Sequence, residues 1–272
     1  MTLVSVNRRP QGVPQSLLQA LSDAWFGREL WLALARQDIR FRYRRSLIGP
    51  FWITISMACF CLSVGITFSQ IFKTEIREYL PSLTIGVIIW NYLSATIGES
   101  ASVFADGAAY FRDIAINPIT LIMRMIARNS LVLLHNSVIL ILLFAWLRMP
   151  VSFAILWLIP SLIVMALILI SLSVCFGIVG VRFRDIAPIL GNVLQLFFFL
   201  TPITWEPSAL SADSWLLAVN PFSALVDLWR SPLMGHAPAA SSWLTCLVVL
   251  AISVPTAALL FRRYARQIAL WI

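Results

Sequence analysis

The stretch IRFRYRRSLIGPFWITISMACFCLSVGITFSQI, residues 39 to 71, decides how this chain folds. Four arginines, Arg40, Arg42, Arg44 and Arg45, stand near its front, and no charged residue follows until Lys73. A helix that crosses a bilayer core needs about 20 apolar residues, and an arginine cluster directly before such a run marks the cytoplasmic side. The stretch therefore predicts that the chain enters a membrane from the cytoplasm here.

The composition of the whole chain agrees with a membrane protein. Of its 272 residues, 60% are hydrophobic and 12% are charged, which excludes an ordinary soluble domain. The net charge of +8 would suit a nucleic-acid partner, but the arginines are distributed as membrane orientation requires. We therefore predict an all-α integral membrane protein without a nucleic-acid partner.

Six charge-free windows are long enough to hold helices of about 20 residues. They cover residues 46–72, 79–98, 129–147, 149–181, 186–205 and 231–261. Six spans place both termini on one side of the membrane. With that side cytoplasmic, the 20 basic residues divide into 16 on inner segments and 4 outside, namely Lys73, Arg77, Arg148 and Arg230. This bias predicts that both termini lie in the cytoplasm.

Three segments depart from the pattern of simple spans. From Ser16, apolar residues recur at helical steps between charges, which predicts an amphipathic helix on the membrane surface, either an anchor or a link to a cytoplasmic partner. Residues 105–128 form the longest inner loop and are expected to hold a short amphipathic helix. Residues 206–235 contain an apolar run broken at Asn220-Pro221, which predicts a re-entrant pair of half-helices on the outer face.

These segments predict a division of the chain into two parts. Residues 1–45 form a cytoplasmic tail with the amphipathic interfacial helix. Residues 46–272 form a six-span transmembrane domain.

The chain lacks the common sequence motifs of nucleotide-binding, metal-binding and catalytic sites. It contains no Gly-Lys-Ser/Thr, HExxH or GxSxG motif, and two histidines do not make a metal site by themselves. Glu99, near the cytoplasmic end of the second span, is expected to face either a partner helix or a proton pathway. We predict no catalytic residue, no metal site and no cofactor in this chain, so that energy for transport must come from elsewhere.

The fifth span carries a polar and aromatic stripe. Asn192, Gln195 and Phe199 recur at three- and four-residue steps, and Phe197 and Phe198 add further rings at the same level. Aromatic faces with sparse amides suit sugar rings, while helix packing explains the stripe equally well.

Small residues mark two other spans. Ser173, Gly177 and Gly180 in the fourth span, and Ser94 and Gly98 in the second, are predicted to allow close approach of helices.

Five motifs follow one another along the chain: RYRRSLIGPFW (42–52), FRDI (183–186), FFLTPI (198–203), NPF (220–222) and RRYARQIALWI (262–272). Together they resemble the membrane subunits of polysaccharide-exporting ATP-binding-cassette transporters. The first is similar to that family's start of span 1, the next three to its span 4–5 turn, its span 5 exit and its outer break, and the last to its tails. The resemblance extends from about Trp31 onward and is closest to O-antigen (lipopolysaccharide) exporters.

The resemblance implies a homodimeric permease of the bacterial inner membrane with two separate ATPase subunits, which bind ATP and Mg²⁺. The assembly would move a polyprenyl-pyrophosphate-linked glycan outward between spans 1 and 5 of both copies. The expected substrate pathway residues are Trp52, Phe60, Phe68, Asn192, Gln195, Phe198 and Phe199. The residues expected to contact the ATPase are Arg112, Asp113, Asn117, Arg184 and Asp185.

The arginines before span 1 have two explanations. Arg42, Arg44 and Arg45 lie at the level of lipid headgroups, where they either bind the pyrophosphate of the carrier or only set the topology.

Other functions also remain open: a capsule, teichoic-acid or small-molecule exporter, an assembly scaffold, or a membrane enzyme acting on lipid-linked sugars. The enzyme would use Glu99 and Asp106, the nearest pair of carboxylates.

Overall fold

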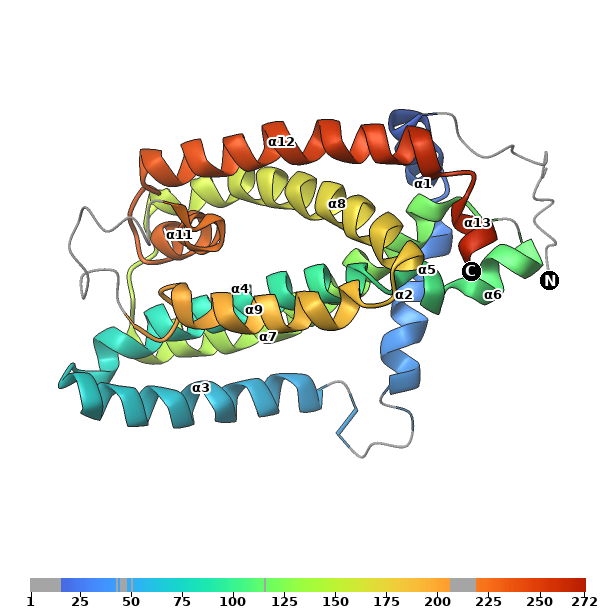
Figure 1. Ribbon diagram of the computed structural model, residues 1–272. Coiled ribbons are helices and arrows are strands. Elements are labelled where there is room, and N and C mark those ends of the chain that lie inside the picture. Colours follow the sequence, from blue (N-terminus) through green and yellow to red (C-terminus); the bar gives the residue numbers. More distant parts are fainter. Residues whose placement is uncertain (1–15, 43, 45–47, 50, 115, 206–218) are drawn as a thin grey trace.

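The computed structural model describes residues 16–42, 44, 48–49, 51–114, 116–205 and 219–272, the side chains of 112–114 excepted, and its regular structure is helical throughout (Figure 1). Five helices in this part of the chain are long and apolar enough to cross a membrane. They are α3 (Phe51–Phe72), α4 (Ile76–Ser100), α7 (Pro118–Leu147), η1 with α8 (Phe153–Trp157 and Leu158–Arg182), and α12 (Ala240–Tyr264). The prediction of an all-helical membrane protein is confirmed.

The predicted fifth span is shorter than expected. Helix α9 covers Ile186–Leu200, 15 residues, where the sequence predicts a span over 186–205. At about 1.5 Å per residue it rises roughly 22 Å, less than the bilayer core of about 30 Å. The helix ends because Pro202 follows, and Thr201 before it takes the extended backbone (φ −96°, ψ 137°) that a residue preceding proline prefers.

Two other predicted boundaries are wrong. Helix α7 begins at Pro118 rather than at 129, because Arg124 and Arg128 are paired with carboxylates and lie within the helix. Helix α12 begins at Ala240 rather than at 231. The residues just after 230 instead complete α11 (Pro221–Leu233), which is followed by a turn with Gly235 at φ 93°.

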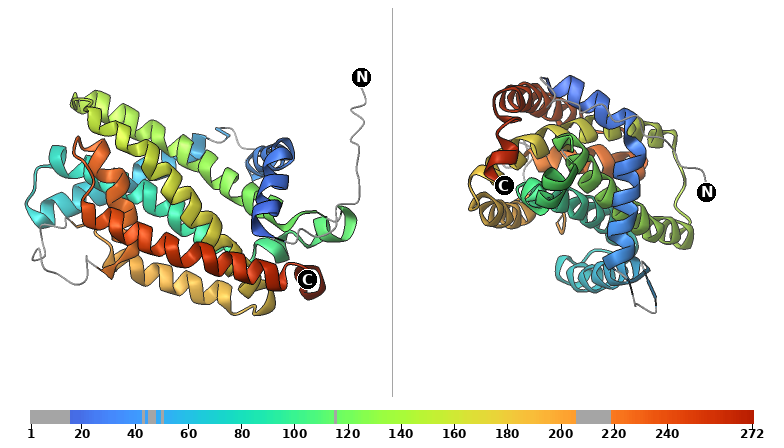
Figure 2. Two further views of the ribbon diagram at one scale, coloured as in Figure 1. Left: turned by 90° about the horizontal axis from the view of Figure 1, so that it is seen from above. Right: turned by 90° about the vertical axis from the view of Figure 1, so that its right-hand side faces the viewer.

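The amino-terminal amphipathic segment forms two helices instead of one, α1 (Leu17–Phe26) and α2 (Arg28–Arg42). They are separated at Gly27, and the indole Nε1 of Trp31 donates a hydrogen bond across this break to the carbonyl of Ala24, at 2.9 Å. Figures 1 and 2 show that α2 runs across one end of the bundle, at a steep angle to the long helices. Its buried face packs mainly on α7.

Helix α4 is the centre of the bundle, since 16 of its 25 residues are buried, whereas α3 buries only Cys61, Gly65 and Ser69. One hydrophobic core surrounds α4. A second core lies at the end that carries α1, and it also contains residues of α5 (Val103–Asp106), α7, α8, α12 and α13 (Ile268–Trp271).

Glycines bring α8 unusually close to the end of α4. A Cβ atom added at Gly180 would lie 2.0 Å from the carbonyl oxygen of Ala101, and one added at Gly177 would lie 2.9 Å from the ring of Phe104. The predicted small-residue face of the fourth span is therefore confirmed.

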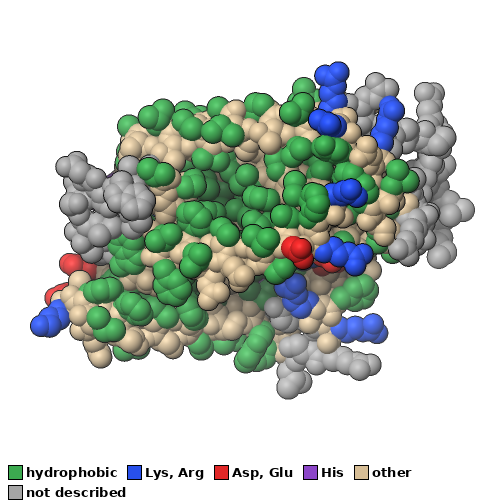
Figure 3. Space-filling view, viewed as in Figure 1, with side chains coloured by type: hydrophobic (Ala, Val, Ile, Leu, Met, Phe, Trp, Pro, Cys, Tyr) green, Lys and Arg blue, Asp and Glu red, His purple; other side chains and the backbone are tan. Residues whose placement is uncertain are grey.

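On the face shown in Figure 3, charged side chains gather toward the ends of the molecule, whereas Arg230 lies inside it beside Gly86 of α4. Figure 3 shows that lysine and arginine side chains gather at the end that carries α1 and α13, while hydrophobic side chains cover much of the rest of this face. This arrangement agrees with helices that have both ends at membrane surfaces.

Candidate functional site

A groove runs between the central helix α4 and the short helix α9, and we name it the α4–α9 groove. Its volume is about 430 Å³. It is lined by Trp90, Ser94 and Gly98 of α4 and by Gly191, Leu194, Gln195, Phe198 and Phe199 of α9. A Cβ atom at Gly98 would lie 3.6 Å from the Leu194 side chain, an ordinary contact distance. Ser94 and Gly98 therefore leave a space open here, unlike the glycines of α8.

Aromatic rings gather at the end of this groove nearest α11. The centroids of Trp90 and Phe198 lie 5.8 Å apart, and those of Trp90 and Phe222 lie 5.4 Å apart. Phe197 also contacts Phe222, with a centroid distance of 4.9 Å. The rings thus join α4, α9 and α11 in one cluster.

Asn220 fixes the start of α11 against the end of α9. Its side-chain oxygen accepts hydrogen bonds from the backbone N–H groups of Phe222 (3.0 Å) and Ser223 (3.4 Å), as a helix N-cap does. Its amide nitrogen donates to the carbonyl of Leu200 (3.2 Å) and to the hydroxyl of Thr201 (3.0 Å). The FFLTPI and NPF motifs, separate in sequence, therefore meet in space.

The predicted pathway residues of the fifth span lie on or beside the groove. Gln195, Phe198 and Phe199 line it, and Asn192 is exposed on the same helix. Only Leu190 and Leu194 of α9 are buried, so most of this apolar helix is left uncovered by the described residues.

The predicted pathway residues of the first span lie elsewhere. Trp52 is 53% exposed and Phe60 is 47% exposed on α3, whereas Phe68 packs against the core around α4. Helix α3 packs mainly on α4 and α7, and α9 mainly on α4 and α8. The two halves of the predicted pathway therefore occupy different sides of α4.

An ionic junction joins three helices at the end of the bundle that carries α1. Asp38 of α2 accepts two hydrogen bonds from Arg124 of α7, at 2.8 Å from Nε and 2.5 Å from Nη2. Arg128, one turn further along α7, lies 3.6 Å from Asp38 and also pairs with Glu99 of α4. Asn129 donates to the same Glu99 carboxylate, at 2.9 Å. Glu99 thus faces a partner helix, one of its two predicted roles.

The ionic junction borders a polar cavity of about 260 Å³. Arg42 lines this cavity together with Glu99 and Asp106, so the structure brings the two carboxylates of the enzyme hypothesis to one place. Both carboxylates have partners, since Glu99 pairs with Arg128 and Asp106 accepts a hydrogen bond from Ser102, at 2.7 Å.

The other two arginines of the predicted headgroup site do not line this cavity. Arg44 is exposed beyond the end of α2. Arg45 lies outside the residues that the structure describes.

Asn117, one of the expected ATPase contacts, has an internal structural role. Its side-chain oxygen caps α7 by accepting a hydrogen bond from the backbone of Ile119 (3.0 Å), and its amide donates to the carbonyl of Ala20 in α1 (2.8 Å). Asn117 therefore connects the amino-terminal helices to the start of α7.

The remaining expected contacts lie in two surface segments. Arg184 and Asp185 are exposed in the turn between α8 and α9. Arg112 and Asp113 lie on the short helix α6 (Ala108–Ile114), and their side chains fall outside the described part of the structure.

Sequence reasoning missed the members of the ionic junction other than Glu99. A signal was available, because Arg124 and Arg128 are four residues apart at the start of an apolar run and therefore share one helix face. Asp38 is a second signal, because it is the one acidic residue among the arginines of positions 36–45. The sequence pattern predicts which residues share a face of each helix, but it does not predict which faces of two helices pack together.

Five helices in the described part of the chain are long and apolar enough to cross a membrane, and a sixth, shorter apolar helix borders an open groove. These features define a polytopic membrane protein. The chain belongs to the ABC-2 type transporter family, whose pattern matches residues 29–234.

Two curated relatives support the same family. The O-antigen export system permease protein RfbA of Myxococcus xanthus is 24% identical over 224 residues, covering 81% of this chain and 86% of the relative. The protein of the same name from Klebsiella pneumoniae is 22% identical over 209 residues, covering 76% of this chain and 80% of the relative.

Proposed function

We propose that this chain is the transmembrane subunit of an ATP-driven exporter that moves lipid-linked O-antigen polysaccharide across the bacterial inner membrane. The α4–α9 groove carries the proposal, because it combines aromatic faces with a polar amide in a chain of the ABC-2 type transporter family. Sugar rings stack on aromatic faces and need hydrogen-bond partners for their hydroxyl groups. The names of the relatives, O-antigen export system permease proteins, support O-antigen as the cargo.

The groove becomes a channel when a second copy covers it. Both α3 and α9 bury few residues within one chain, so each has an apolar face available for a homodimer. Trp52 and Phe60 of one copy would then approach Gln195, Phe198 and Phe199 of the other. Helix α9 and residues 201–205 form the sixth crossing, with α11 as one half of a re-entrant outer segment, whose other half falls in residues 206–218, outside the described part of the chain.

Two separate ATP-binding-cassette subunits supply the energy, and they bind the ATP and Mg²⁺. They contact this chain through α6 and the α8–α9 turn, where Arg112, Asp113, Arg184 and Asp185 lie. Displacement of α6 reaches the spans through the ionic junction, because the Tyr110 ring of α6 lies 5.1 Å from the Arg124 guanidinium of α7. Asp38 connects the same arginine to α2. Asn117 adds a second link, from α1 to the start of α7.

The arginines that precede α3 bind the pyrophosphate of the lipid carrier at the cytoplasmic face. Arg42 lines a polar cavity in which Arg124 and Arg128 are paired with Asp38 and Glu99, so Arg42 supplies the positive charge offered to an anionic group. Arg44 and Arg45 follow within three residues in the sequence and add positive charge to this segment.

A single substitution in the groove tests the proposal. Ser94→Trp would fill the α4–α9 groove, and Leu142→Trp, at a position 65% exposed on α7, adds the same side chain outside it. In cells that lack the natural copy, we expect Ser94→Trp to reduce glycan at the outer face at least tenfold, at equal protein abundance. Leu142→Trp should export normally.

Two results would change the proposal. Normal export by Ser94→Trp would show that the glycan does not use this groove. Export of a capsular polysaccharide or a teichoic-acid precursor, but not of O-antigen, would reassign the cargo within the same kind of transporter.

A further inference from the structure

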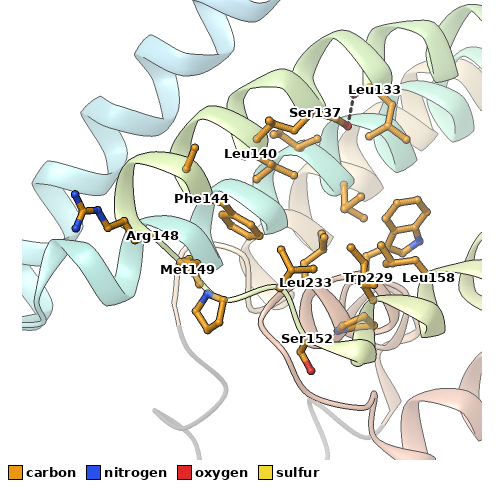
Figure 4. A pocket seen from close by; sticks show the side chains of 18 residues that line it. Leu133, Ser137, Leu140, Phe144, Arg148, Met149, Ser152, Leu158, Trp229 and Leu233 are labelled. Carbon is orange, nitrogen blue, oxygen red and sulfur yellow. Dashed lines mark hydrogen bonds between the residues drawn. The ribbon is translucent and has the colours of Figure 1, made fainter.

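A second cavity lies on the other side of the bundle, near α11, and none of the transport steps above uses it. Its volume is about 620 Å³, within the range of roughly 300–1,000 Å³ that is typical of small-molecule sites. Figure 4 shows side chains from α7, from the start of α8 and from α11 around it. Six of them are Leu140, Phe144, Ile155, Leu158, Trp229 and Leu233.

The few polar side chains in this wall are already used. The Ser137 hydroxyl donates to the Leu133 carbonyl of its own helix at 2.9 Å, and Ser152 accepts a hydrogen bond from the backbone of Ala154 at 3.3 Å. Arg148 stands at the rim, and Figure 4 shows its guanidinium directed away from the cavity. The cavity therefore offers little to a polar ligand and favours an apolar one.

The surroundings of the cavity are those of a membrane interior. On α7, Ile141 is 68% exposed at the cavity wall and Leu142 beside it is 65% exposed. On α8, Ile159 is 61% exposed next to the wall residue Leu158. Exposed apolar side chains on both flanks mean that the cavity opens toward lipid chains, which are available there at high concentration.

Trp229 contributes the apolar surface of its indole ring to the wall, whereas its Nε1 atom is buried from the cavity. The wall therefore presents aromatic and aliphatic surface, which an acyl chain matches.

We propose that this cavity binds an acyl chain of a glycerophospholipid from the adjoining leaflet. The chain fills the space between α7 and the Trp229–Leu233 face of α11, and so supports a helix too short to cross the membrane by itself. Residues Ile88 and Ile89 of α4 form the cavity floor, whereas Trp90 and Ser94 line the α4–α9 groove. The lipid site is thus separate from the proposed glycan path and does not depend on it.

The test uses the full-length chain in nanodiscs that contain phosphatidylethanolamine with a photoactivatable group in its acyl chain. After illumination, mass spectrometry locates the cross-linked peptides. We expect label concentrated in residues 133–145 and 229–233. Ser137→Phe places a ring in the cavity and should lower that label at least fivefold, whereas Val138→Phe, 44% exposed on the same helix and not in the wall, should leave it unchanged.

A second filling variant, Ala145→Phe, guards against a folding defect of Ser137→Phe and should also lower the label. Label spread evenly over the exposed faces of α7 and α8, or undiminished in both filling variants, would overturn the proposal. Displacement of the label by added polyprenyl phosphate, but not by added unlabelled phospholipid, would also overturn it, by assigning the site to the carrier lipid. Loss of glycan export with normal labelling would affect only the proposed transport function.

Discussion

At the scale of single residues, two Asn-Pro pairs have the same structural role at opposite ends of the bundle. Asn117 and Asn220 each cap a helix whose first residue is proline, a favourable helix start. Each also donates a hydrogen bond to a carbonyl near another helix, at Ala20 and Leu200 respectively. One side chain therefore both begins a helix and fixes its position against a neighbour.

Glycine at position 180 is required by the close approach of α8 to Ala101. Gly180→Ala should lower the free energy of unfolding by roughly 1–3 kcal/mol, because the new methyl group meets backbone atoms that cannot move aside. Thermal unfolding of the purified protein in detergent measures the effect.

Gly191→Ala is the matched control, since a Cβ atom there meets nothing within 4 Å. Both changes add the same methyl group to an apolar helix, so their intrinsic helix propensities change equally. Equal melting temperatures for the two variants would contradict the packing argument.

At the scale of elements, α2 is attached to the bundle by charge as well as by apolar contact. The side chains of Arg124 and Asp38 retain 21% and 16% of their exposure, so the pair is largely but not fully removed from water. Removal of one member of an ion pair at this depth costs more than at the surface, because the other charge is left without a partner away from water. The junction is thus suited to hold α2 and α7 together while both move.

Arg124→Gln should therefore loosen α2. We expect a loss of about 1–3 kcal/mol in unfolding free energy, between the values for exposed and fully buried pairs. If α2 transmits the motion of the ATPase, the variant should also hydrolyse ATP with less export per ATP. Thermal unfolding and the ratio of export to hydrolysis measure the two effects.

A charge exchange separates the ion pair from other roles of Arg124. The double variant Asp38→Arg with Arg124→Asp restores opposite charges and should recover part of both losses, while Arg262→Gln, exposed on α12, should change neither. Failure of the exchange to recover anything would mean that Arg124 acts through contacts other than Asp38, such as the Tyr110 ring 5.1 Å away.

At the scale of the whole molecule, charge and burial agree on how the chain sits in a membrane. The described arginines near α1, α2 and α13 share one end of the bundle, and Lys73 and Arg77 lie at the turn between α3 and α4. Basic residues concentrate on the cytoplasmic side of membrane proteins. We therefore expect α1 and α13 to lie on the cytoplasmic side.

Reporter fusions measure this orientation. A fluorescent protein that matures only in the cytoplasm should fluoresce when fused after Ile272. Alkaline phosphatase, which is active only outside, should be active when fused after Thr74, in the exposed turn between α3 and α4. Phosphatase activity at the carboxyl terminus would reverse the orientation, and with it the direction of transport.

The pattern along the chain was sufficient for the properties that depend on local composition. Apolar runs without charge predict the long helices, and the Gly-containing face of α8 predicts its close packing, since these follow from residues near one another in sequence. The aromatic and amide stripe of α9 likewise predicts Gln195, Phe198 and Phe199 as groove residues.

Only the tertiary structure decided how distant segments meet. Charges at Arg124 and Arg128 made the start of α7 look like a loop, and their partners Asp38 and Glu99 lie on other helices. The same holds for Asn220, whose bonds to Leu200 and Thr201 join two motifs, and for the division of the predicted pathway residues between two sides of α4. A local sequence pattern determines which residues share a face of a helix, but which faces pack together depends on the packing of the whole chain.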